Sequence, residues 1–93
     1  MLHAFVLIDA EPARIAALAE ELADVNGVAE AYSVAGGVAD LVAIVRVARH
    51  EDLAEVVTGG IDAMTGIVST TTLVAFQAFS RHDLEAIWDI GPA

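Results

Sequence analysis

Two short clusters of polar residues in this 93-residue chain could bind a small molecule. The first is the stretch from Gly36 to Asp40, where Gly36 and Gly37 expose backbone N–H groups and Asp40 could hold an ammonium group. The second is the run Ser69-Thr-Thr-Thr72, whose four hydroxyls could bond a carboxylate or an amide. Each cluster also has a plain structural alternative, because Gly and Asp are common in turns and Thr is common in strands.

Groups that could carry catalysis are few. His3, His50 and His82 are far apart in the sequence and share no metal-ligand spacing. The chain has four Lys and Arg in all, no phosphate-binding loop with its Lys, and no nucleophile with a recognisable base. It also lacks cysteine, which excludes disulfides and thiolate chemistry. The sequence therefore predicts a protein that is not an enzyme and that holds no metal or cofactor.

Charge and hydrophobicity narrow the class of protein. The formal net charge of −10 argues against direct binding to nucleic acid and against anionic membranes. No apolar run approaches the roughly 18 residues of a membrane span, and the first apolar run lacks the basic flank of a signal peptide, so we expect a cytoplasmic protein. With 57% hydrophobic residues, the chain has more apolar surface than a small domain can bury by itself. The excess indicates an interface between copies of the chain.

Hydrophobic periodicity predicts the elements that position the two clusters. One strand is expected to carry Val28 and Tyr32 on the same face, and Gly59-Gly60 is expected to kink or end the second helix. The predicted elements, in order, are a strand over 2–8, a helix over 12–25, strands over 28–35 and 41–47, a helix over 50–64, a long strand over 65–79 and a short C-terminal helix from Ser80.

This order predicts an α+β, ferredoxin-like βαββαβ sandwich, a four-stranded antiparallel sheet with both main helices on one face. A half-solvated sheet normally alternates apolar and polar residues along its strands. Here the strands are apolar on both sides, so we expect a second subunit to cover the face that the helices leave bare, sheet against sheet.

Several segments together resemble the effector-binding domain of the Lrp/AsnC transcription regulators, in the form that stands alone without a DNA-binding domain. The likeness extends along essentially the whole chain. It is carried, in order, by Gly27-Val28, Tyr32-Ser-Val-Ala-Gly36, Asp40-Leu-Val-Ala-Ile-Val-Arg-Val47, His50-Glu-Asp-Leu53, Gly66-Ile67, Thr70-x-Thr72 and Phe79-Ser-Arg-His-Asp-Leu-Glu85.

The resemblance implies one ligand-binding domain over residues 1–93, dimers formed through the sheets, a ring of dimers, and a small amino-acid-like effector bound near contacts between dimers. It implies that Asp40 binds the ammonium group, and that the hairpin backbone and the threonine hydroxyls bind the carboxylate or side chain. The hairpin is one residue longer than the family pattern and lacks the aromatic that often precedes the Asp. The implied ligand-binding residues are Gly36, Gly37, Asp40, Thr70, Thr72, Leu73 and Val74.

The leading hypothesis is therefore a non-enzymatic, oligomeric sensor of amino-acid-like molecules, which could modulate transcription by co-assembly with a full-length Lrp/AsnC regulator. One alternative is a dimeric αβ-barrel enzyme of the monooxygenase or isomerase type, which would need a His, Asn or Trp aimed between sheet and helices. A second alternative is a purely structural oligomerisation module that binds no ligand.

Overall fold

The computed structural model describes residues 1–79 and 81, and the predicted C-terminal helix falls almost wholly outside them. The described elements follow the predicted order. They are β1 (Leu2–Ala10), a 3₁₀ turn (Pro12–Arg14), α1 (Ile15–Ala23), β2 (Val28–Ser33), β3 (Leu41–Val47), α2 (His50–Ala54) with a π-helical continuation (Glu55–Ile61), and β4 (Ile67–Val74).

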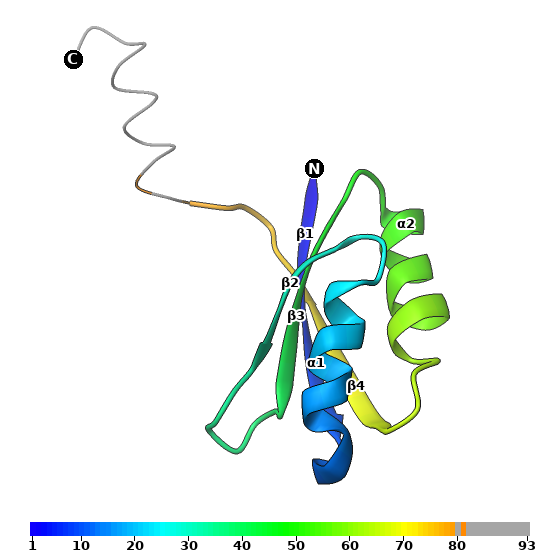
Figure 1. The fold of residues 1–93 in the computed structure, drawn as a ribbon. Coiled ribbons are helices and arrows are strands. Elements are labelled where there is room, and N and C mark those ends of the chain that lie inside the picture. Colours follow the sequence, from blue (N-terminus) through cyan, green and yellow to red (C-terminus); the bar gives the residue numbers. More distant parts are fainter. Residues whose placement is uncertain (80, 82–93) are drawn as a thin grey trace, which may run out of the picture.

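The four strands form one sheet in the order β2-β3-β1-β4, and every neighbouring pair is antiparallel. Both α1 and α2 lie against the same face of the sheet (Figure 1). The predicted ferredoxin-like α+β fold is therefore confirmed, with β1 and β3 in the centre and with β2 and β4 at the edges.

The core lies between the sheet and the two helices. Alternate residues of β1 and β3 point into it, as the period of a strand requires. From the other side, Leu18 and Leu22 of α1 and Leu53 of α2 complete it. The buried side chains in the described residues are all aliphatic: Ala4, Val6, Ile8, Ala10, Leu18, Leu22, Leu41, Ala43, Val45, Val47, Leu53, Val56 and Ile61.

In the described part of the chain, no helix lies on the opposite face of the sheet, and we call this face the open face (Figure 1). Its centre is apolar, and Tyr32 and Leu73 are each 50% exposed there. Polar residues of this face also contact each other across neighbouring strands: Ser69 Oγ donates to Asp9 Oδ2 (2.8 Å). Strand alternation and register place on it His3, Phe5, Leu7, Asp9, Glu30, Tyr32, Val42, Ile44, Arg46, Ser69, Thr71 and Leu73.

Two expectations about the edge strands were wrong. Val28 and Tyr32 do not share a face, because a register shift between Val28 and Glu30 inserts an extra residue into β2. Val28 therefore packs against the core, while Tyr32 lies on the open face. The long strand predicted over 65–79 is also shorter, since β4 ends at Val74 and the chain then leaves the sheet.

The expected disturbance at Gly59-Gly60 takes the form of a π-helix over Glu55–Ile61. A third glycine, Gly27, lets the π-helix approach the turn before β2, because a Cβ atom at Gly27 would lie 2.5 Å from Cγ2 of Val56. Gly27 also has φ +99°, a conformation that side chains disfavour. Gly59, by contrast, has nothing within 4 Å of an added Cβ.

We expect Gly27→Ala to lower the free energy of unfolding by about 2–4 kcal/mol, because it adds backbone strain and a steric clash with Val56. The matched control, Gly59→Ala, should be neutral or should raise stability by up to about 1 kcal/mol, because it adds helix propensity without a clash. Urea unfolding measures both. Equal losses of stability in the two variants would show that the close approach at Gly27 is not what the fold depends on.

Candidate functional site

The predicted hairpin is present between β2 and β3, and Asp40 fastens it to the end of β1. The backbone N–H of Val34 donates to the carbonyl of Asp40 (2.9 Å), and that of Asp40 donates to the carbonyl of Ile8 (2.9 Å). The Asp40 carboxylate accepts the backbone N–H of Ala10 through Oδ2 (2.9 Å). Asp40 is half-buried and therefore has a structural task besides any contact with a ligand.

The two glycines of the hairpin lie at its exposed tip. An added Cβ would meet nothing within 4 Å at either position, and Gly37 has φ +82°, which glycine adopts readily. Their backbone is therefore open to an approaching molecule. Within this protomer, nothing packs closely on that side of either glycine in the described part of the chain.

The predicted positions on β4 are divided between the two faces of the sheet. Thr70 and Thr72 pair with the buried Ile8 and Val6 and so point to the helix side, whereas Leu73 pairs with Phe5 on the open face. Val74 returns to the helix side and is 44% exposed. The Thr70 hydroxyl already donates to Oδ1 of Asp62 (2.9 Å).

The structure does bring the hairpin and Thr70 to the same end of the sheet. Asp40 bonds the end of β1 from one side, while Thr70 is the β4 neighbour of Ile8 on the other side. Two strand spacings, about 10 Å, therefore separate them. Thr72 and Leu73 lie further along β4, towards its C-terminal end. The seven predicted residues therefore do not converge on one point within a single protomer.

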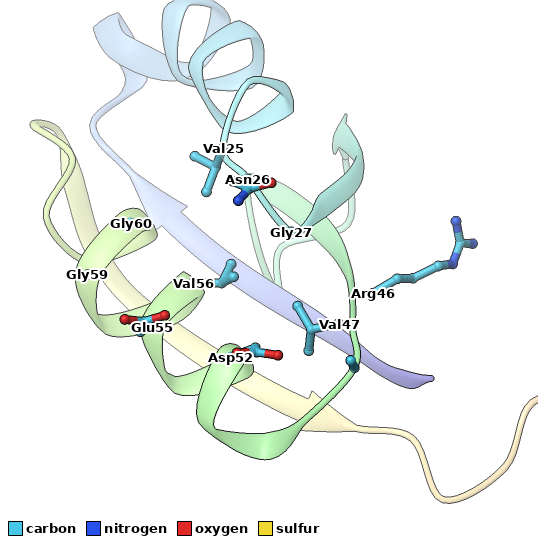
Figure 2. Close-up of a pocket in the computed structure, with 11 residues that line it drawn as sticks. Val25, Asn26, Gly27, Arg46, Val47, Asp52, Glu55, Val56, Gly59 and Gly60 are labelled. Atoms are coloured by element: carbon cyan, nitrogen blue, oxygen red, sulfur yellow. The ribbon is translucent and has the colours of Figure 1, made fainter.

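A groove that the sequence did not predict lies between the C-terminal end of α1 and the helix α2, with a volume of about 700 Å³ (Figure 2). Val25, Val47 and Val56 supply its apolar surface. Asp52 and Glu55 lie along α2 at its edge, and Gly59 and Gly60 present bare backbone (Figure 2). None of the seven predicted ligand-binding residues lines it. The sequence signal at this place is the Gly59-Gly60 pair, which predicts a kink or an early end of the helix and not a groove.

The charges around the groove make it acidic. Asp52 pairs with Arg49 at 3.4 Å, an exposed contact that contributes little free energy. Arg46 extends away from the groove (Figure 2) and lies 3.9 Å from Glu30 on the open face. This arrangement favours a neutral or positively charged group over a phosphate or carboxylate.

Among the described residues, no set of three or more His, Asp and Glu side chains is placed to hold a metal ion. Within the same residues, every helix is too short or too polar to cross a membrane.

Tyr32 and Glu30 form a hydrogen-bonded pair on the open face, in which the Tyr32 hydroxyl donates to Oε2 of Glu30. This hydrogen bond, and then the negative charge of Glu30, raise the pKa of the Tyr32 phenol above its ordinary value of about 10. Arg46 acts in the opposite direction more weakly. Because the folded-state pKa is the higher one, the unfolded chain releases this proton first, so stability falls as pH rises above about 10.

We expect the Glu30→Ala variant to bring the pKa of Tyr32 back towards its ordinary value, because both the acceptor and the charge are removed. The tyrosinate absorbance reports this directly, since Tyr32 is the single tyrosine of the chain. Glu20→Ala is the control, because it removes an equal charge from α1. Equal shifts in the two variants would show that overall charge, and not the local pair, sets this pKa.

Comparison with known proteins then places the chain in a family. The family model described as the Lrp/AsnC ligand binding domain matches residues 3–84. The chain belongs to this family. The match extends through all four strands and both helices, and it includes the hairpin with Asp40 and the threonines of β4. A search of curated proteins found no match.

Solved structures of similar length support this placement. TTHA0845 from Thermus thermophilus is 48% identical, with a TM-score of 0.81 over 87% of this chain and 100% of that one. FFRP-DM1 is 32% identical, with a TM-score of 0.76 over 82% of this chain and 100% of that one. The hypothetical protein PHS023 from Pyrococcus horikoshii is 30% identical, with a TM-score of 0.76 over 88% of this chain and 98% of that one.

Proposed function

We propose that this Lrp/AsnC domain is an oligomeric sensor that binds a small amino-acid-like effector and acts in transcription regulation, without catalysis. The observation that carries the proposal is the match of a ligand-binding domain family along residues 3–84. A similar protein whose structure contains a bound amino acid supports the proposal. The feast or famine regulatory protein of M. tuberculosis, solved in complex with L-methionine, is 27% identical, with a TM-score of 0.66 over 86% of this chain and 53% of that one.

The oligomer that we propose begins with a homodimer in which two open faces pack together. The apolar centre of the open face, with Phe5, Ile44 and Leu73, is the surface that such packing would remove from water. A two-fold axis would place the same patch on both partners, so that one surface serves both sides of the interface. A ring of such dimers is the further assembly.

We place the effector at a contact between subunits. Gly36, Gly37 and Asp40 would come from the hairpin of one subunit, and Thr70, Thr72, Leu73 and Val74 from β4 of another. The separation of these two groups within the protomer supports this arrangement. Oδ2 of Asp40 bonds Ala10, so the other carboxylate oxygen is the candidate acceptor for an ammonium group.

A single ligand-binding domain of this kind would act in the cytoplasm and would influence DNA through co-assembly with a full-length regulator. Its formal charge of −10 supports an indirect route, since DNA contacts need clustered Lys and Arg. A pocket of the αβ-barrel enzyme type would need a polar group between sheet and helices. Among the described residues, the buried side chains at that place are aliphatic, which weighs against this alternative.

A thermal-shift panel of the twenty amino acids, with L-methionine included, tests the sensing proposal. A ligand present at about 100 times its Kd stabilises the native state by about 2.7 kcal/mol, which raises the Tm of a domain of this size by roughly 10–20 °C. We expect a clear shift with at least one compound. A flat panel with the oligomer intact would support a structural oligomerisation module in place of a sensor.

The decisive variant for that panel is Asp40→Asn. It keeps an oxygen that can accept the Ala10 N–H, so the hairpin should stay attached, but it removes the charge that would bind an ammonium group. We expect the ligand-induced shift to be lost while the ligand-free Tm changes little. Glu20→Gln is the control, because it removes an equal charge from an exposed residue of α1 that lies outside the proposed site. An unchanged shift in Asp40→Asn would exclude the proposed role of Asp40.

The homodimer is tested by Ile44→Asp, which places a charge in the centre of the open face. We expect sedimentation to show a dimer or a ring of dimers for the native chain at micromolar concentration and a monomer for this variant, because an unpaired charge is costly to bury. Ala17→Asp adds the same charge on the exposed side of α1 and should leave the dimer intact. A native chain that sediments as a monomer would rule out the homodimer.

A further inference from the structure

Residues 75–79, which we call the arm, leave the sheet and carry two exposed aromatic rings. The backbone N–H of Ala75 still donates to the carbonyl of His3 (2.9 Å), and beyond it the arm runs away from the sheet (Figure 1). Phe76 is 103% exposed and Phe79 is 79% exposed. Burying one phenylalanine side chain is worth about 1.5–3 kcal/mol. In the described part of the chain, neither ring obtains that stabilisation.

The composition of the arm is that of a strand and not of a solvated loop. The residues from Thr65 to Phe79 include no charged side chain and no proline, although the whole chain has a formal charge of −10. Because β4 is an edge strand, no strand among residues 1–79 pairs with the outer side of its backbone. The arm therefore continues an apolar, uncharged edge that could add to another sheet.

A second copy of the chain is the partner that fits these features. The formal net charge of −10 makes two copies repel each other, whereas the arm and the centre of the open face carry no charged side chain. Five extended residues span about 17 Å, and packed sheets lie about 10 Å apart. The arm is thus long enough to cross from its own sheet to a sheet packed on the open face.

We propose that the arm is exchanged between the two subunits of the dimer. The arm of each subunit lies against the sheet of the other, where Phe76 and Phe79 pack on apolar side chains and the backbone gains hydrogen bonds. This inference rests on the proposed packing of two open faces. It adds a second contact, which forms twice around the two-fold axis of each dimer.

The test combines a variant of the arm with hydrogen exchange. In Phe76→Ser/Phe79→Ser, both rings are removed from exposed positions, so the fold should be unchanged, which the Tm at low concentration verifies. We expect the Kd of the dimer to rise at least tenfold by sedimentation. The control variant Gln77→Ser changes a polar residue of the same arm and should leave the Kd unchanged. The amides of residues 76–79 should exchange slowly above the Kd and quickly below it.

The outcomes separate the arm from the interface on which it depends. If Ile44→Asp dissociates the dimer but the arm variant keeps the native Kd and the arm amides stay unprotected, the exchange is overturned and the open-face dimer stands. If the native chain is a monomer at every concentration, both proposals are overturned. A weakened dimer together with loss of amide protection in the arm variant supports the exchange.

Discussion

The constraint on which this molecule depends is that its sheet is apolar on both faces, while the helices of the described residues cover only one. On the covered face, a core of aliphatic side chains forms from β1, β3, α1 and α2 with its π-helical continuation. The open face leaves Phe5, Tyr32 and Leu73 in contact with water in the protomer. Because apolar burial is the main favourable term in folding and association, the simplest stable arrangement is one in which a second sheet covers the first.

The two faces of the sheet also separate the residues predicted to bind the effector. At one end of the sheet, the Asp40 carboxylate accepts a hydrogen bond from β1, and the Thr70 hydroxyl donates one to Asp62. Thr72 and Leu73 lie on opposite faces of β4, so one protomer presents fragments of a site instead of a finished pocket. A ligand that needs fragments from two subunits would bind only to an assembled state. Such a dependence couples effector binding to assembly by linkage, since the ligand stabilises whichever state it binds.

Much of the fold could be predicted from the sequence, because doubly apolar strands and amphipathic helices leave strong periodic signals. The face of Val28 could not, since a register shift in β2 reverses the alternation within one residue. The end of β4 at Val74 depends on the ladder to β1, which the composition of residues 75–79 does not report. The groove could not be predicted because it depends on how α2 and the π-helix that follows it, which contains Gly59 and Gly60, lie beside the end of α1. Spacing along one chain likewise does not show whether Asp40 and Thr72 meet across subunits.

The most direct test of this account is a calorimetric titration of the effector identified in the amino-acid panel, carried out on the native chain and on the Ile44→Asp variant. The site is proposed to need two subunits, so the native assembly should bind with a defined stoichiometry. The folded monomeric variant should bind at least a hundredfold more weakly, or not at all, although Ile44 is not one of the seven proposed ligand-binding residues. Equal affinity for the native chain and for the monomer would contradict the account, because one protomer would then contain the complete site.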